Sequence, residues 1–220
     1  MPVIVFASSK GGVCKTTTAI ITGTEFDRRG VPVTYIDLDR SNYSLTRWRK
    51  RAELPSSIKF LEGVNESNVI SKIRKHDKDN SILIVDLEGV VSRLTSRAIS
   101  QADLVIVPMA SSIDAMVGGD VLNLILEEEQ MLGRKIKYSV VLARTNAGFP
   151  YKEEKRIRKD LDVHNVHTIE PSLNNRAPFA AFFYHGGTLE TMTGENGLEQ
   201  ARKNAAYFVD SVQARLQDEV

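Results

Sequence analysis

The segment Val3–Thr17, Val-Ile-Val-Phe-Ala-Ser-Ser-Lys-Gly-Gly-Val-Cys-Lys-Thr-Thr, decides the fold of this chain. Its first part, Val3–Ala7, is a continuous apolar run that predicts a strand buried on both faces. A glycine-rich loop follows, and the residues from 16 to 29 have helical spacing up to Gly30, a helix stop. A strand, a loop of small residues and a helix in this order can bind phosphate, because loop N–H groups and the positive end of the helix point at one place.

Within this loop the residue types predict separate tasks. Lys15 is expected to neutralise the charge of the β- and γ-phosphates, and the Thr16 hydroxyl is expected to bind Mg²⁺. Against the general pattern G-x-x-x-x-G-K-[ST], Ser9 and Cys14 replace the two outer glycines. The residues expected to contact the nucleotide here are Lys10, Gly11, Gly12, Val13, Cys14, Lys15, Thr16 and Thr17.

The rest of the chain repeats the alternation of strand and helix. Further apolar runs cover 33–36, 82–85, 104–107 and 139–142, and stretches with helical spacing cover 65–76, 115–132 and 197–216. Continuous rather than alternating apolar runs are typical of strands in a parallel sheet with helices on both faces. We therefore expect an α/β fold, a doubly wound and mainly parallel sheet, in a single domain over residues 1–220.

Composition limits the kinds of partner. The net charge of the 220 residues is +1, with 42% hydrophobic and 26% charged residues, so any contact with nucleic acid has to come from local patches. The single cysteine, Cys14, excludes an intrachain disulfide, which fits a reducing compartment. The start of the chain has no basic segment before its short apolar run, so we expect no signal peptide and a cytoplasmic location.

Carboxylates follow two of the predicted strands. Asp37 and Asp39 stand two apart at a strand end, so both point toward the edge where the phosphate loop lies. Asp86 ends the run Ile82–Val85, the pattern of a strand that carries a carboxylate to the water shell of Mg²⁺. The alternative for the aspartate pair is an exposed turn with solvated carboxylates. Gly89 is expected to let the backbone move near the γ-phosphate, and Glu88 stays unassigned.

The segment Lys10–Thr17 resembles the deviant Walker A motif, KGGxGKTT, of the ParA/MinD family. The resemblance implies that Lys10 reaches the phosphates of a partner subunit in a nucleotide-sandwich dimer. The segment beginning at Asp37 is similar to the family's DxDPQ motif, with Arg40-Ser41 in place of Pro-Gln. By this similarity Asp39 orients the attacking water, and Asp37 lies near Mg²⁺, which Thr16 and Asp86 bind.

The resemblance covers most of the chain. Similar segments are Ser44–Trp48, Ala102–Pro108 with Asp114 after it, Arg144–Asn146, Asn174–Arg176 and Gly186–Gly187. Arg144 and Asn146 match the strand end that contacts adenine in the family. The chain is most similar to the short ParF-like DNA partition proteins and to ParA-like proteins of conjugative transfer. This implies an ATPase that binds ATP and Mg²⁺, forms a homodimer, binds DNA without sequence preference and is stimulated by a cargo-bound partner, near the nucleoid.

Cys14 departs from the family, which has glycine at this place. One interpretation is that Cys14 is a tolerated small residue. The other is that its side chain crowds the loop or strains it, if the position needs glycine-like dihedral angles, and so weakens nucleotide binding.

Three functions compete. The first is the DNA-partitioning switch, for which basic clusters at 151–159, at 47–51 and at Arg202, Lys203 and Arg215 are candidate phosphate contacts. The second is a MinD-like membrane positioner, which the acidic end of the chain disfavours. The apolar stripe of 197–216 is therefore expected to pack on the sheet, with no membrane contact. The third is a nucleotide-independent scaffold with a decayed loop at Cys14.

Overall fold

A computed structural model describes residues 1–76 and 81–218, although for residues 112–118 it describes the backbone and not the side chains. Asp114 therefore lies outside the described side chains. The strands are β1 (Val3–Phe6), β2 (Val33–Leu38), β3 (Ile58–Phe60), β4 (Ile82–Leu87), β5 (Leu104–Met109), β6 (Tyr138–Thr145) and β7 (Leu173–Asn174). The helices are α1 (Lys15–Arg28), α2 (Ser44–Arg49), α3 (Val69–Lys75), α4 (Arg93–Ile99), α5 (Ser112–Leu132), α6 (Lys152–Val163), α7 (Ala177–His185) and α8 (Leu198–Gln217).

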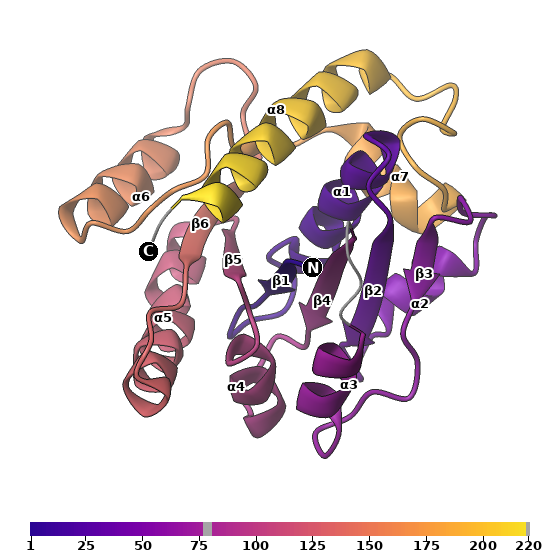
Figure 1. Ribbon diagram of the computed structural model, residues 1–220. Helices are drawn as coiled ribbons and strands as arrows, with labels where there is room; N and C mark the ends of the chain where they lie inside the picture. Colours follow the sequence, from indigo (N-terminus) through magenta and orange to yellow (C-terminus); the bar gives the residue numbers. More distant parts are fainter. Residues whose placement is uncertain (77–80, 219–220) are drawn as a thin grey trace.

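The strands form one seven-stranded sheet in the order β3-β2-β4-β1-β5-β6-β7, and every paired neighbour is parallel. The expected doubly wound parallel sheet is confirmed, and all five predicted strands are present (Figure 1). In such a sheet the carboxyl ends of all strands meet at one edge. The loops after β1, β2 and β4 therefore lie side by side.

Two apolar layers hold helices on the two faces of the sheet. One layer joins α1, α2, α7 and α8 to residues such as Ile4 and Tyr35, and the other joins α3, α4, α5 and α6 to residues such as Val5 and Val85. Successive strand residues point to opposite faces, so an uninterrupted apolar strand supplies both layers. This is the physical reason for the continuous runs in the sequence.

Helix α8 packs as expected. Its stripe of Ala201, Ala205, Phe208, Val209 and Val212 is fully buried in the first layer, and in Figure 1 the helix crosses the top of the molecule beside α1. Among the residues that the structure describes, no helix is both long enough and apolar enough to cross a membrane.

The predicted helix over 65–76 was too long. Helix α3 begins only at Val69, because Asn68 and Asn65 form a turn before it: the Asn68 side-chain oxygen accepts from the Asn65 N–H at 2.8 Å, and the Asn65 oxygen accepts from the Ser67 N–H at 3.0 Å. Asparagine side chains compete with helical hydrogen bonds in this way. The helix predicted over 115–132 begins three residues earlier, at Ser112.

Candidate nucleotide and magnesium site

The loop Ser8–Cys14 joins β1 to α1 and is shaped as an open cradle. The Ser8 hydroxyl donates to the Lys10 carbonyl at 2.6 Å and closes the base of the loop. A Cβ atom added at Gly11 or Gly12 would meet nothing within 4 Å. Because the loop leaves this space open above its backbone, a phosphate group has room to approach it.

The side chains on either side of the cradle differ in burial. Lys15 and Thr16, at the start of α1, are 6% and 9% exposed. Lys10 is exposed at the tip of the loop. A buried lysine below the cradle and an exposed one at its tip fit the predicted division, in which Lys15 serves phosphates of its own subunit and Lys10 those of a partner.

Cys14 occupies the left-handed backbone region, with φ 68° and ψ 20°. A side chain in this region costs roughly 1–2 kcal/mol compared with glycine. Its carbonyl accepts from the N–H and the hydroxyl of Thr18, both at 2.8 Å, so the helix fixes this conformation. The glycine-like dihedral angles that the sequence raised as an alternative are therefore confirmed.

Gly89, after β4, lies directly against the phosphate loop. A Cβ atom at this residue would stand 2.6 Å from both the Gly11 nitrogen and the Lys10 carbonyl carbon. Only glycine fits at such a distance from backbone atoms. The strand that carries Asp86 is thus in van der Waals contact with the loop that carries Lys10.

A hydrogen bond joins Thr16 and Asp86, the two residues predicted to bind Mg²⁺. The Thr16 hydroxyl donates to Oδ2 of Asp86 at 2.7 Å. Asp86 is fully buried, and its Oδ1 has no hydrogen-bond partner among the described residues. Burial raises the pKa of Asp86 to about 7, while the charge of Lys15 opposes this shift.

These features fit a magnesium ion. A buried carboxylate oxygen without a partner is costly unless a cation compensates it. Mg²⁺ commonly takes one or two protein oxygens and completes its shell with phosphate oxygens and water. In the described part of the chain no group of three or more His, Cys, Asp or Glu side chains could hold a metal ion by itself. Thr16 and Asp86 would therefore hold Mg²⁺ together with a nucleotide.

Asp39 is 4% exposed, and its carboxylate is held by Asn42. The Asn42 backbone N–H donates to Oδ1 at 3.1 Å, and its side-chain amide donates to Oδ2 at 3.2 Å. A carboxylate fixed by two donors keeps one orientation, as a group that positions a water molecule must.

Asp37 lies opposite Asp86 in the register of β2 and β4. Its Oδ2 accepts from the N–H and the hydroxyl of Thr46, at 2.9 and 2.7 Å, and its Oδ1 accepts from the Asp39 N–H at 3.2 Å. Burial raises the pKa of Asp37. Since Thr46 is the third residue of α2, this carboxylate caps that helix in the manner of a distant N-cap, a task that the sequence did not predict.

Glu88, left unassigned from the sequence, contacts the loop after β2. Its carboxylate accepts a hydrogen bond from the Ser41 hydroxyl. Ser41 belongs to the Arg40-Ser41 pair that replaces the Pro-Gln of the DxDPQ motif. The two loops that follow β2 and β4 are therefore joined by a hydrogen bond between side chains.

A cavity of about 370 Å³ adjoins the start of α1. Its lining joins Cys14 and Thr17 to Arg144, which has a positive φ of 58°, and to Arg176, whose Nε is buried without a partner among the described residues. The other lining residues are Thr18, Ile21, Ala143, Leu173, Asn174, Asn175, Phe179, Ala180, Phe183 and Tyr184. A flat apolar cavity with a few polar groups is what a nucleotide base requires.

The two predicted adenine contacts are placed differently. Arg144 lines the cavity, whereas Asn146 is absent from its lining, and the Asn146 side chain accepts from the Gly148 N–H at 3.1 Å and closes a turn. Sequence reasoning missed Phe179 and Tyr184. Both belong to α7, which α2 holds in place through the Trp48 indole N–H, a donor to the Gly187 carbonyl at 2.8 Å.

The parallel sheet, the glycine-rich cradle and the Thr16–Asp86 pair define the P-loop class of nucleotide-binding proteins. Comparison with known proteins shows to which family within this class the chain belongs. Residues 1–85 match a family model described as an AAA domain. Over 218 residues the chain is 44% identical to "Protein ParA" of Rhizobium radiobacter, and the match covers 98% of both chains. The chain belongs to the ParA family, whose members are generally P-loop ATPases.

Solved structures share the fold at low identity. An McdA variant from Cyanothece in complex with ATP is 16% identical, with a TM-score of 0.76, and the match covers 100% of this chain and 98% of the other. MinD from Aquifex aeolicus is 17% identical, with a TM-score of 0.70 and coverage of 100% and 99%. A putative plasmid partition protein from Borrelia burgdorferi bound to AMPPNP is 12% identical, with a TM-score of 0.70 and coverage of 97% and 99%.

Proposed function

We propose that this protein is an ATP-dependent dimerising switch that binds DNA without sequence preference and positions or partitions a DNA cargo, with slow hydrolysis that a cargo-bound partner stimulates. The observation that carries the proposal is the buried Thr16–Asp86 pair below an open phosphate cradle, with an unpartnered carboxylate oxygen among the described residues. The identity to a ParA protein over nearly the whole chain supports the same function. Association with the nucleoid follows if DNA binding holds.

The residues divide the reaction as follows. Lys15 offsets the negative charge of the β- and γ-phosphates of ATP, and the N–H groups of the loop bind their oxygens. The bound Mg²⁺ would neutralise charge that develops on the phosphates. Asp39, fixed by Asn42, orients the water that attacks the γ-phosphate. Lys10 from the partner subunit stabilises the transition state in the manner of an arginine finger.

Base recognition belongs to the cavity beside Cys14. Arg144 and Arg176 supply donors along its wall, and Phe179 supplies an apolar surface. Asn146 would enter this contact only after its turn rearranges, because its side-chain oxygen now accepts from Gly148. Asp37, whose two oxygens already accept hydrogen bonds, would hold Mg²⁺ through water molecules of its shell.

A second candidate, a scaffold that binds nucleotide weakly, is favoured by one observation. Cys14 has a left-handed backbone conformation and lines the cavity proposed to bind the base, so backbone strain and the bulk of this residue both act at the nucleotide site. A membrane positioner has less support, because the apolar stripe of α8 is buried in the core.

The decisive experiment measures ATP binding and turnover with Mg²⁺, with and without duplex DNA, for the natural protein and for Cys14→Gly. Binding and slow turnover by the natural protein support the switch. If only Cys14→Gly binds ATP, the phosphate loop of the natural protein has decayed, and the protein is a nucleotide-independent scaffold. Sedimentation with anionic lipid vesicles tests the membrane alternative, and ATP-dependent co-sedimentation would favour it.

A further inference from the structure

Basic side chains occur in three surface regions, which the fold keeps apart. Helix α2 lies at the β3 end of the sheet, and α6 lies beyond β6 at the opposite end, with α8 across one face (Figure 1). We define the α2 surface as Arg40, Arg47, Arg49, Lys50 and Arg51. The three regions differ in how many of their cations already form ion pairs or hydrogen bonds within the protein.

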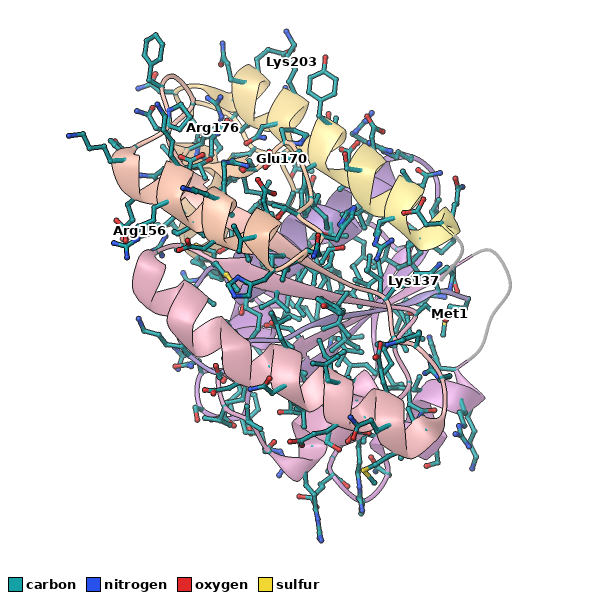
Figure 2. The ribbon with its side chains drawn as sticks, turned by 90° about the vertical axis from the view of Figure 1, so that its left-hand side faces the viewer. Met1, Lys137, Arg156, Glu170, Arg176 and Lys203 are labelled. Carbon is teal, nitrogen blue, oxygen red and sulfur yellow. The ribbon has the colours of Figure 1, made fainter. Side chains whose placement is uncertain are left out.

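The cations of α8 are engaged. Lys203, labelled in Figure 2, pairs with Glu199 at 3.5 Å, and Arg215 pairs with Asp218 at 3.1 Å. The Arg202 guanidinium donates to the Leu189 carbonyl at 2.8 and 3.0 Å. A phosphate would have to compete with these partners, so α8 offers little free positive charge.

Helix α6 carries mixed charge. Arg158 is held by Glu154 and Glu170. The exposed charges are Lys152, Glu153, Lys155, Arg156, Lys159, Asp160 and Asp162, four cations among three acids. Arg156 projects from this helix in Figure 2. Because acids alternate with the cations, the exposed face of α6 has a net charge of only +1.

The α2 surface has a larger net positive charge than the exposed face of α6, and fewer of its cations have acidic partners than those of α8. Residues 40–62 contain six cations, the five of the α2 surface and Lys59, against two acids, Glu53 and Glu62, which leaves a net charge of +4. Arg40, Arg47 and Lys50 are exposed, and within the described residues no ion pair or side-chain hydrogen bond involves their charged groups. Arg49 alone has an acidic partner, Glu62, at 2.6 Å.

Three of the five cations of the α2 surface line a groove. Arg40, Arg49 and Lys50 line this groove of about 680 Å³ together with the aromatic residues Tyr43 and Phe60 and with two acids, Asp37 and Glu62. The positive charge extends from Arg40 to Arg51 rather than converging on one point. An extended distribution matches a polyanion better than a single small anion.

The groove is also connected to the nucleotide site. Asp37 caps α2 through Thr46, and Asp39 holds Asn42, so two carboxylates at the end of β2 fix the segment that carries Arg40 and Arg47. Asp39 therefore stands directly before Arg40 in the chain and is eight residues from Arg47. Neither α6 nor α8 has a hydrogen bond to these carboxylates in the described part of the chain.

We propose that the α2 surface binds the phosphate backbone of duplex DNA. The inference rests on the proposed function, which includes DNA binding, and adds which surface of the protein contacts the DNA. It places the contact at the β3 edge of the sheet and assigns α6 and α8 no more than a minor share.

The test compares two double variants with the same loss of charge. Arg47→Gln/Lys50→Gln removes two unpaired cations from the α2 surface, and Lys155→Gln/Lys159→Gln removes two from α6. Fluorescence anisotropy of a labelled random-sequence duplex, with Mg²⁺ and a slowly hydrolysed ATP analogue, gives Kd over a range of salt concentrations. Arg47→Lys/Lys50→Arg keeps the charge and serves as the rescue control, and thermal unfolding checks that every variant is folded.

We expect the α2 variant to bind about 10- to 100-fold more weakly near 0.1 M salt, with the slope of log K against log salt reduced by about 2. The α6 variant and the charge-keeping variant should bind as the natural protein does. If the α2 variant binds duplex DNA as tightly as the natural protein, or if only the α6 variant loses affinity for DNA, this inference is wrong. Either result leaves the proposed function unaffected. If the natural protein binds no DNA with the ATP analogue, the proposed function itself fails.

Discussion

At the scale of single residues, the nucleotide site departs from the usual loop at one position, Cys14. Its backbone conformation is that of a glycine, and the residue lines the cavity proposed to bind the base. Two separate penalties follow: conformational strain, present with or without ligand, and crowding, present only when nucleotide binds. Two substitutions can separate them.

Cys14→Gly should remove both penalties, raising the free energy of unfolding by about 1 kcal/mol and tightening ATP binding. Cys14→Ala keeps the strained φ and removes the sulfur, so it should tighten ATP binding without the gain in stability. Urea unfolding followed by fluorescence of the single tryptophan, Trp48, and calorimetric titration with ATP measure the two effects. Equal stability of the natural protein and Cys14→Gly would show that the left-handed conformation costs nothing here.

Asp86 makes the metal-free protein sensitive to pH. Its folded pKa, about 7, lies above its ordinary value of 3.8. Between these values the folded state binds more protons than the unfolded state, so the free energy of unfolding falls as pH rises from about 4 to about 7. Each unit of pKa difference is worth about 1.4 kcal/mol.

Asp86→Asn should cancel this contribution. In EDTA, the variant should be as stable as the natural protein near pH 4 and more stable at pH 8, by up to a few kcal/mol. It should also lose Mg²⁺-dependent ATP binding. Subtracting the two stability curves removes the contributions of other groups. A difference that does not grow with pH would mean that Asp86 is already ionised in the folded apo protein.

At the scale of elements, the site depends on contacts between loops that follow different strands. Gly89, after β4, lies against the loop after β1, and Asp37, at the end of β2, caps α2. Through these contacts, the position of β4 affects the shape of the phosphate loop, and the position of β2 affects the stability of α2. Each can be broken by one substitution at a residue that is not itself a predicted nucleotide contact.

Gly89→Ala should displace the backbone at Lys10 and Gly11, because the new methyl group would stand 2.6 Å from their atoms. We expect ATP affinity to fall by about tenfold or more, with a stability loss of about 1–3 kcal/mol. Gly119→Ala is the matched control, since a Cβ there meets nothing within 4 Å. Equal ATP affinity in the two variants would show that the loop yields to the methyl group at no cost.

Asp37→Ala should uncap α2 and reduce the free energy of unfolding by about 1–2 kcal/mol, with or without Mg²⁺. Thr46→Val removes one of the same hydrogen bonds without removing a carboxylate, so it should cause part of the same loss. Urea unfolding with and without Mg²⁺·ATP distinguishes a cap from a metal ligand. A stability loss seen only with Mg²⁺ would contradict the capping role.

At the scale of the whole molecule, both apolar layers lie against the same sheet and draw on helices from the first to the last. We infer from this that residues 1–220 fold as one domain. The nucleotide edge of that domain presents Lys10 outward, and in the proposed dimer Lys10 would complete the site of a second copy.

Lys15→Ala should abolish ATP-dependent dimerisation. The variant lacks the buried lysine that offsets the phosphate charge of ATP, and the proposed dimer forms around bound ATP. Asp39→Ala should instead trap the ATP-bound dimer, because water is no longer oriented for attack. Light scattering after gel filtration, with and without ATP, measures both. A Lys15→Ala protein that still dimerises with ATP would refute this role of Lys15, and normal turnover in Asp39→Ala would remove Asp39 from the reaction.

Local pattern was sufficient for the sheet and for the phosphate loop. Continuous apolar runs specify buried parallel strands, and a lysine and threonines after glycines specify a phosphate site, because both follow from neighbours in the chain. Asp86 could be placed for the same reason: a strand end fixes the edge on which its carboxylate lies. The sequence by itself thus determined the fold class and the family, and it predicted the residues of the phosphate site.

The tertiary structure decided what depends on residues far apart in the chain. That Asp86 keeps one oxygen without a partner among the described residues, that Asp37 caps α2 and that Gly89 contacts the phosphate loop depend on the register between β1, β2 and β4, which local pattern does not encode. The base cavity likewise needs α7 to lie against α1, and the α2 surface emerges only when the ion pairs of α6 and α8 are known. The sequence sets which chemical groups are available at each position. Long-range packing decides which of these polar and charged groups have no partner within the protein and can therefore bind a ligand.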